Sequence, residues 1–144
     1  MRLRACVSAP NRPVHPFNPT MPALRLLYVE DHADLREVTV MLLEEEGLAV
    51  FACASAEAAQ TAFAAATFDV LMTDVNLPTL PGTELATRLQ QGRPDLWVVF
   101  CSGSPMQQGL NAWGPRARAL RKPFEADDLH AVFNEIQASI DAAV

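Results

Sequence analysis

The sequence predicts an α/β fold built on a doubly wound parallel sheet. Over residues 24–142, short apolar runs alternate five times with longer segments of helical periodicity. Alternation of this kind produces parallel strands joined by right-handed crossovers, which place helices on both faces of the sheet. At 144 residues the chain is long enough for one domain with a full hydrophobic core.

Residues 24–66 hold the first two strand–helix units. The first strand is a continuous apolar run, and the helix after it carries Leu35, Val38 and Leu42 at spacings of three and four, which predicts that they form its inner stripe. The second helix is rich in alanine, which favours helix formation, and Ser55 can cap it.

The third unit contains the central strand. The run Val70-Leu71-Met72 is followed by Asp74 and then by a loop that two prolines and Gly82 keep from continuing as a strand. Leu85 and Leu89 then face inward from a short helix.

The last two units run to the end of the chain. The fourth strand is almost entirely apolar, the fourth helix is irregular, and the final helix has the clearest apolar stripe. That stripe consists of Leu129, Val132, Phe133, Ile136 and Ile140. The strands are expected at 24–29, 48–52, 70–72, 96–101 and 117–120. The helices are expected at 34–46, 55–66, 83–91, 105–114 and 125–142.

This order of elements favours a flavodoxin-like sheet with strand order 2-1-3-4-5. The domain is expected at 23–144, after a separate proline-rich segment at 1–22 in which a proline recurs every third residue from Pro10 to Pro22. That spacing is the repeat of a polyproline II helix. The segment is a disordered tail, sequence upstream of a start at Met21, or a ligand for a proline-recognising domain.

The composition indicates a cytoplasmic protein that does not bind nucleic acid. The formal net charge is −6; three arginines give residues 1–20 a charge of +3, which leaves −9 for the rest. Nucleic-acid binding needs clustered Lys and Arg. Three scattered cysteines without a CxxC pair are typical of a reduced compartment. No apolar run approaches the length of a membrane span.

Polar side chains follow the carboxyl ends of four expected strands, where open α/β sheets bind ligands. They are Glu30 and Asp31, Asp74, Ser102-Gly103, and Lys122-Pro123. Converging carboxylates repel one another unless a cation lies among them, and magnesium suits such hard oxygen ligands. Lys122 is the only lysine in the chain, and with a hydroxyl it would complete a site for a phosphoryl group.

Together these motifs resemble the receiver domain of two-component response regulators, of the chemotaxis-regulator type, over about residues 24–142. The resemblance rests on Glu30-Asp31, Asp74 with Pro78 and Gly82, Ser102-Gly103 and Lys122-Pro123-Phe124. It implies that a histidine kinase or histidine phosphotransfer protein donates a phosphoryl group to this chain, and that a downstream protein partner responds.

The resemblance also implies a role for each residue. Asp74 would be the phosphoacceptor, with Lys122 and Ser102 contacting the phosphoryl group. The ligands of Mg²⁺ would be Glu30, Asp31, Asp74 and the carbonyl of Asn76. The backbone groups that hold the phosphoryl group would be those of Val75, Asn76 and Gly103. Pro123 would follow a cis peptide bond, and Ser104 would tune water access together with Asn76.

Two features depart from the family pattern. Ala119 occupies a position where many receivers carry a Tyr or Phe that swings inward, so we expect switching through backbone shifts around 102–106 instead. Gly109, Gly114 and Pro115 weaken the fourth helix, which belongs to a face (fourth helix, fifth strand, fifth helix) through which a homodimer is possible.

We therefore expect a stand-alone receiver that catalyses only its own phosphorylation and dephosphorylation. One alternative is a pseudo-receiver that acts as a protein-binding scaffold and never carries phosphate. Another is a receiver fragment of a larger hybrid kinase or regulator. A phosphatase with an aspartyl nucleophile would need an acid at position 76, where Asn stands, and a cap domain.

Overall fold

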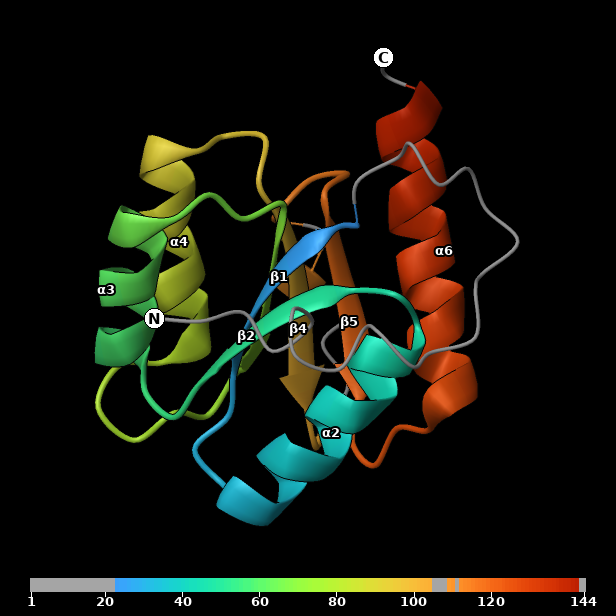
Figure 1. The fold of residues 1–144 in the computed structure, drawn as a ribbon. Coiled ribbons are helices and arrows are strands. Elements are labelled where there is room, and N and C mark those ends of the chain that lie inside the picture. Colours follow the sequence, from blue (N-terminus) through green and yellow to red (C-terminus); the bar gives the residue numbers. More distant parts are fainter. Residues whose placement is uncertain (1–22, 105–108, 111, 143–144) are drawn as a thin grey trace.

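A computed structural model describes residues 23–104, 109–110 and 112–142 of the chain. Five parallel strands form one sheet in the order β2-β1-β3-β4-β5 (Figure 1). The predicted fold class and strand order are therefore confirmed. The strands are β1 (Arg25–Val29), β2 (Ala49–Cys53), β3 (Val70–Asp74), β4 (Trp97–Ser102) and β5 (Ala117–Arg121). The helices are α2 (Ala33–Glu45), α3 (Ala56–Ala65), α4 (Gly82–Gly92) and α6 (Ala126–Ala142).

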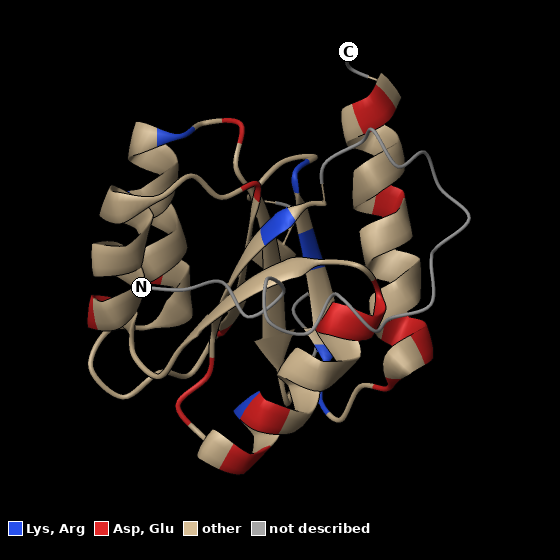
Figure 2. Ribbon diagram, viewed as in Figure 1, with Lys and Arg blue, Asp and Glu red and all other residues tan. Residues whose placement is uncertain are grey.

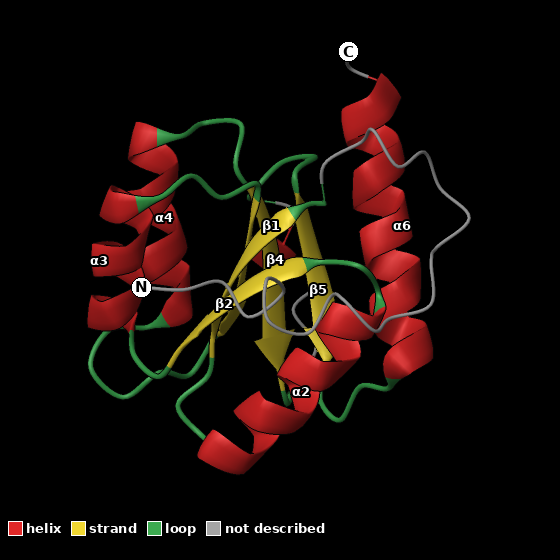
Figure 3. Cartoon of the chain, in the orientation of Figure 1, coloured by secondary structure: helices red, strands yellow, loops and turns green. Residues whose placement is uncertain are grey.

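Helices cover both faces of the sheet. Helices α2 and α6 lie on one face and α3 and α4 on the other (Figures 1 and 3). The sheet side chains alternate between two cores: Leu26 and Tyr28 of β1 point toward α2 and α6, whereas Leu27 and Val29 point toward α3 and α4. Every residue of the central strand β3 is buried, as a strand covered on both faces must be.

The strand register brings four chain segments to one edge of the sheet. Val29 pairs with Thr73, Asp74 pairs with Cys101, and Ser102 pairs with Arg121. Because all strands are parallel, the residues that follow β1, β3, β4 and β5 emerge side by side at the carboxyl edge. This is the edge at which the sequence places its polar residues.

The predicted inner face of α2 is partly wrong: Leu42 is half-buried and packs against the core, and Leu35 is half-buried, but Val38 is not on this face. Val38, expected in the apolar stripe, is 50% exposed, and Met41 is 55% exposed. The buried residues are instead Thr39, Val40, Leu43 and Glu44. Two polar residues on the inner face and two apolar residues on the outer face disguise the true periodicity. By contrast, the predicted stripes of α4 and α6 are confirmed at Leu85, Leu89, Leu129, Phe133 and Ile136, all of which are buried.

Two expected segments lie wholly or partly outside the described residues. The proline-rich segment at 1–22 lies outside entirely. Of the fourth helix, expected at 105–114, residues 105–108 and 111 lie outside, and residues 109 and 110 are described as helical. Within the described ranges, no helix combines the length and the apolarity needed to cross a bilayer.

The corrected orientation of α2 makes a direct prediction for stability. Leu43 is fully buried and Met41 is exposed on the same helix. We expect Leu43→Ala to lower the free energy of unfolding by about 2–5 kcal/mol, because it leaves a cavity in the core. Met41→Ala should change it by no more than about 0.5 kcal/mol. Urea denaturation of both variants measures this difference, and equal losses would refute the orientation.

Candidate functional site at the carboxyl edge of the sheet

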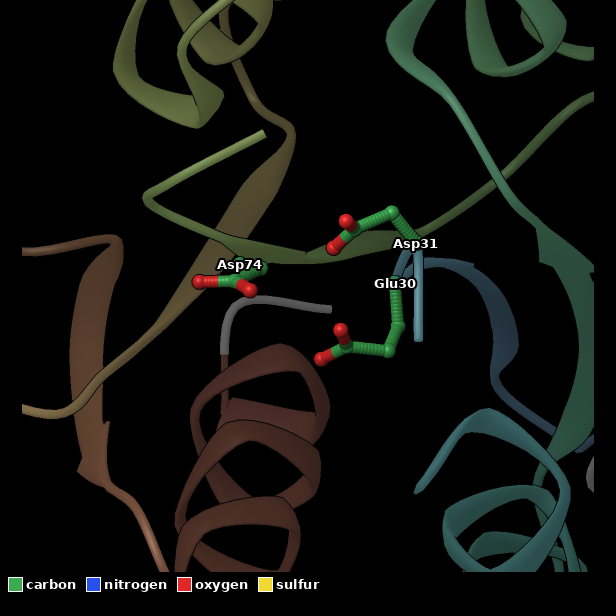
Figure 4. A group of neighbouring side chains, drawn as sticks. All are labelled: Glu30, Asp31 and Asp74. Carbon is green, nitrogen blue, oxygen red and sulfur yellow. The ribbon is translucent and has the colours of Figure 1, made fainter. Parts of the chain in front are cut away.

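Three carboxylates meet at the carboxyl edge of the sheet. Glu30 and Asp31 follow β1, Asp74 ends the neighbouring strand β3, and one oxygen of each lies within 4.8 Å of the others (Figure 4). Glu30 and Asp74 are only 2% and 8% exposed, whereas Asp31 is exposed. One further acidic residue, Asp34, lies in the first turn of α2, which follows this cluster (Figure 2). Buried like charges at this distance need a cation among them.

Lys122 supplies one such cation. Its ammonium nitrogen Nζ donates to Glu30 Oε1 at 2.8 Å and to Asp74 Oδ2 at 2.9 Å. Burial alone would lower the pKa of Lys122, but the bonds to Glu30 and Asp74 outweigh this effect and raise the pKa above its ordinary value. The side chain therefore stays charged at neutral pH. One positive charge against three carboxylates still leaves the site with a net negative charge.

The other oxygens of the two buried acids are held by backbone amides. Asp74 Oδ1 accepts from the N–H of Asn76 at 3.1 Å, and Glu30 Oε2 accepts from the N–H of His32 at 3.1 Å. Asp31, in contrast, makes no hydrogen bond within the described part of the chain. Its exposed carboxylate is therefore the acid most available to an incoming cation.

Gly82 packs directly against the backbone of Asp74. A Cβ atom at position 82 would lie 2.1 Å from the carbonyl oxygen of Asp74 and 3.0 Å from Thr73 Oγ1. The Gly82 N–H also donates to Val75 O at 2.9 Å, which closes the loop that follows β3. The sequence identifies Gly82 as part of this loop, but the contact shows why no other residue fits: the start of α4 approaches β3 too closely for any side chain.

Ser102 ends β4 between Asp74 and Lys122. It is buried, its Oγ accepts from the N–H of Ser104 at 3.1 Å, and its carbonyl accepts from the N–H of Lys122 at 2.8 Å. The hydroxyl is thus engaged with its own loop in this conformation. At Gly103 a Cβ atom would meet nothing within 4 Å, so this glycine leaves open space above the edge of the sheet.

The other predicted site residues also lie at this edge. The Lys122–Pro123 bond is cis. The N–H of Val75, expected to hold phosphate, instead donates to Cys101 O at 3.0 Å and continues the β3–β4 ladder, so it is occupied here. Ala119 is exposed and lines, with Lys122 and Val132, an open depression of about 660 Å³ between β5 and α6.

Two residues that were not predicted from the sequence support Glu30 and Asp31, the acidic pair that follows β1. His32 caps α2, since its Nδ1 accepts from the N–H of Leu35 at 3.3 Å, although His is not a common cap residue. Arg36 Nη1 donates to the carbonyl of Glu30 at 2.8 Å. Neither residue belongs to a motif, but both fall within the first turn after the acids, where side chains can reach back to them.

The chemistry of the donor set fits a divalent cation with hard ligands. All three side-chain donors are carboxylate oxygens, and no described His or Cys joins the group. Magnesium is usually bound by one or two carboxylates and keeps several waters, which an arrangement with one exposed acid and an open rim allows.

Comparison with known proteins shows which family this chain belongs to. The profile of the response regulator receiver domain matches residues 26–134. The response regulator receiver protein CpdR of Brucella abortus is 34% identical over 121 residues, which span 83% of this chain and 98% of the relative. Among solved structures, a receiver domain protein from Clostridium thermocellum superposes with a TM-score of 0.75 at 23% identity, covering 84% of this chain and 99% of the other.

A third similar protein was solved with ligands. The response regulator TrrA from Thermotoga maritima, in complex with Mg²⁺ and BeF, superposes with a TM-score of 0.70 at 23% identity. The match covers 78% of this chain and 97% of that protein. At this identity, the likeness to both solved structures concerns the fold.

The Gly82 contact gives a prediction with a control on the same helix. We expect Gly82→Ala to destabilise the protein by about 1–3 kcal/mol or more, because the added methyl group overlaps the Asp74 carbonyl. Gly92, at the other end of α4, has open space around it. Gly92→Ala should therefore be neutral or stabilising, by up to about 1 kcal/mol. Urea denaturation measures the free energy of unfolding of both variants. If Gly82→Ala were as stable as the wild type, α4 would not be in close contact with β3.

Proposed function

Because this chain belongs to the response regulator receiver domain family, whose members accept a phosphoryl group on an aspartate, we propose that Asp74 is its phosphoacceptor. One observation carries the assignment. Asp74 is the buried acid at the end of the central strand, its carboxylate lies in the three-acid cluster, and it is bonded to the only lysine in the chain.

The reaction transfers a phosphoryl group from a phosphohistidine of a partner protein. A carboxylate oxygen of Asp74 attacks the phosphorus, an O–P bond forms and the P–N bond breaks. The imidazole leaves with the bonding electron pair, takes up a proton from solvent, and an acyl phosphate remains on Asp74. The Lys122 ammonium offsets charge on the transferred oxygens, and the small Ser102 and Gly103 leave room for them. The N–H groups of Asn76 and Gly103 are the backbone donors we assign to these oxygens.

The acidic cluster is the proposed Mg²⁺ site. Asp31 and Asp74, with the carbonyl of Asn76, would hold the ion directly, and Glu30, the most deeply buried of the three acids, would do so through water. When bound, the ion offsets negative charge on the transferring phosphoryl group. The relative TrrA, solved with Mg²⁺ and BeF, supports this assignment.

Receiver domains interact with histidine kinases or phosphotransfer proteins, and we propose such a donor for this chain. We further propose a downstream protein partner, a cytoplasmic location, a domain spanning 23–144, and β5 with α6 as the face of a possible homodimer. Ser104 and Asn76, which flank the acceptor, are assigned to control of water access. Neither supplies an acid or base to the transfer itself.

Phosphorylation is tested by intact-mass spectrometry after incubation with a small phosphodonor such as phosphoramidate. We expect the wild type to gain one phosphoryl mass only when Mg²⁺ is present, and Asp74→Asn to gain none. Asp95→Asn is the control, since Asp95 is an exposed acid just before β4, at the amino ends of the strands, and is paired with Arg93. If no adduct forms and a beryllium fluoride mimic causes no NMR shifts, the chain is a scaffold that carries no phosphate.

A substitution at Lys122 separates the contribution of its ammonium group to phosphorylation from the contribution of Mg²⁺. In Lys122→Met, the ammonium no longer competes for Glu30 and Asp74, so we expect Mg²⁺ to bind more tightly than in the wild type. Phosphorylation should nevertheless slow by about tenfold or more, because a cation on the transferring oxygens is lost. Calorimetric Mg²⁺ titration and phosphorylation time courses give the two values. Weaker Mg²⁺ binding in the variant would show that Lys122 organises the acids rather than competing for them.

A further inference from the structure

We propose that Arg36 is a positioning residue for the acidic pair. By holding the carbonyl of Glu30, its guanidinium fixes the peptide that joins Glu30 to Asp31, and so aims the Asp31 carboxylate at the cation site. The inference rests on the proposed function, because it concerns how that site binds Mg²⁺.

Every polar group of Glu30 has a partner, and the partners come from β2, from the end of β5 and from the start of α2. Its N–H donates to Cys53 O of β2 at 3.0 Å, and its two side-chain oxygens accept from Lys122 and from the N–H of His32. Its carbonyl oxygen accepts from Arg36 Nη1 at 2.8 Å. Glu30 is also 2% exposed. Arg36 is therefore the side chain that satisfies the one remaining group of a buried residue.

The carbonyl that Arg36 holds lies in the peptide that leads to Asp31. Asp31 is exposed and makes no hydrogen bond of its own in the described part of the chain. Its direction is therefore set by the backbone on either side. On one side is the Glu30 peptide, held by Arg36; on the other is His32, whose carbonyl accepts from the N–H of Arg36 at 2.9 Å. The bond to His32 is a main-chain bond of the helix, so only the bond to the Glu30 carbonyl depends on the Arg36 side chain.

The arginine is anchored in a way that suits this role. It lies in the first turns of α2, and its side chain is half-buried. Its positive charge also acts on the end of β2, where it lowers the pKa of Cys53 against the larger effect of burial, which raises that pKa to about 11. The guanidinium is held at the end of β1 by its bond to the Glu30 carbonyl.

Charge and positioning predict opposite effects of removing Arg36. A positive charge beside an acidic site repels Mg²⁺, so electrostatics alone predicts tighter Mg²⁺ binding in a neutral variant. If Arg36 instead holds Asp31 in place, a neutral variant binds Mg²⁺ more weakly. Loss of a group that orients a metal ligand typically costs about 10- to 100-fold in metal affinity. The sign of the change therefore separates the two roles.

The test is a Mg²⁺ titration of the full, unphosphorylated chain. Calorimetry and the NMR shift of the Asp31 amide measure the binding. We expect Arg36→Met and Arg36→Gln to raise the Mg²⁺ Kd by about tenfold or more. Arg36→Lys, whose ammonium can reach the same carbonyl, should recover part of the loss. Arg116→Met is the control: Arg116 is an exposed arginine just before β5, at the opposite edge of the sheet, and its loss should leave the Kd unchanged.

The outcomes distinguish this inference from the proposed function. If the wild type binds Mg²⁺ and the folded neutral variants bind it equally well or more tightly, the positioning role is overturned while the site stands. If the wild type itself binds no Mg²⁺, the magnesium part of the proposed function fails, and this inference fails with it. Far-UV circular dichroism checks folding, and the polar Gln variant provides the result if the Met variant does not fold.

Discussion

The bridge from Lys122 to Glu30 and Asp74 is the interaction on which the site depends. Two of the three clustered acids are buried, and buried carboxylates are costly unless a cation accompanies them. The ammonium comes from the end of β5, two strands away from β3, so it spans the end of β4 to reach Asp74. The residue at the end of β4 must therefore be small, and Ser102 with Gly103 meets this requirement. The strand order places Lys122 two strands from Asp74, and the small residues at the end of β4 allow its side chain to reach across.

The backbone at the acceptor is as constrained as the charges are. The carbonyl of Asp74 accepts from Thr73 Oγ1 at 3.0 Å and lies against Gly82, while its carboxylate is held by Asn76 and Lys122. Close packing on the carbonyl side and the two hydrogen bonds to the carboxylate together fix the orientation of the residue. As the proposed nucleophile, Asp74 held in this way needs little reorganisation before it reacts, which is how a site that relies on positioning achieves its rate.

The sequence predicts the features that depend on order and residue type, and misses those that depend on close contact. Strand alternation is sufficient to predict the sheet, and polar residues after apolar runs are sufficient to predict Glu30, Asp31, Asp74, Ser102 and Lys122 at one edge. The inner face of α2 could not be predicted from periodicity, because Thr39 and Glu44 are buried while Val38 and Met41 are exposed. The occupied N–H of Val75 and the support from Arg36 follow from spatial neighbours that no spacing along the chain specifies.

The hydrogen bonds at Asp74 also define what a phosphoryl group must change. Both carboxylate oxygens accept hydrogen bonds in this conformation, one from Asn76 and one from Lys122. An acyl phosphate turns one of them into the bridging oxygen of a mixed anhydride, a much weaker acceptor, and places three phosphoryl oxygens just beyond it. The side-chain donors at this edge are the Lys122 ammonium and the Ser102 hydroxyl, whose oxygen now accepts from the N–H of Ser104 in its own loop. Their shift toward the phosphoryl oxygens would pull on the ends of β4 and β5. Because Ala119 offers no ring to follow that pull, we propose that the change reaches the surface through the backbone after Ser102 and through the depression beside Lys122 and Val132.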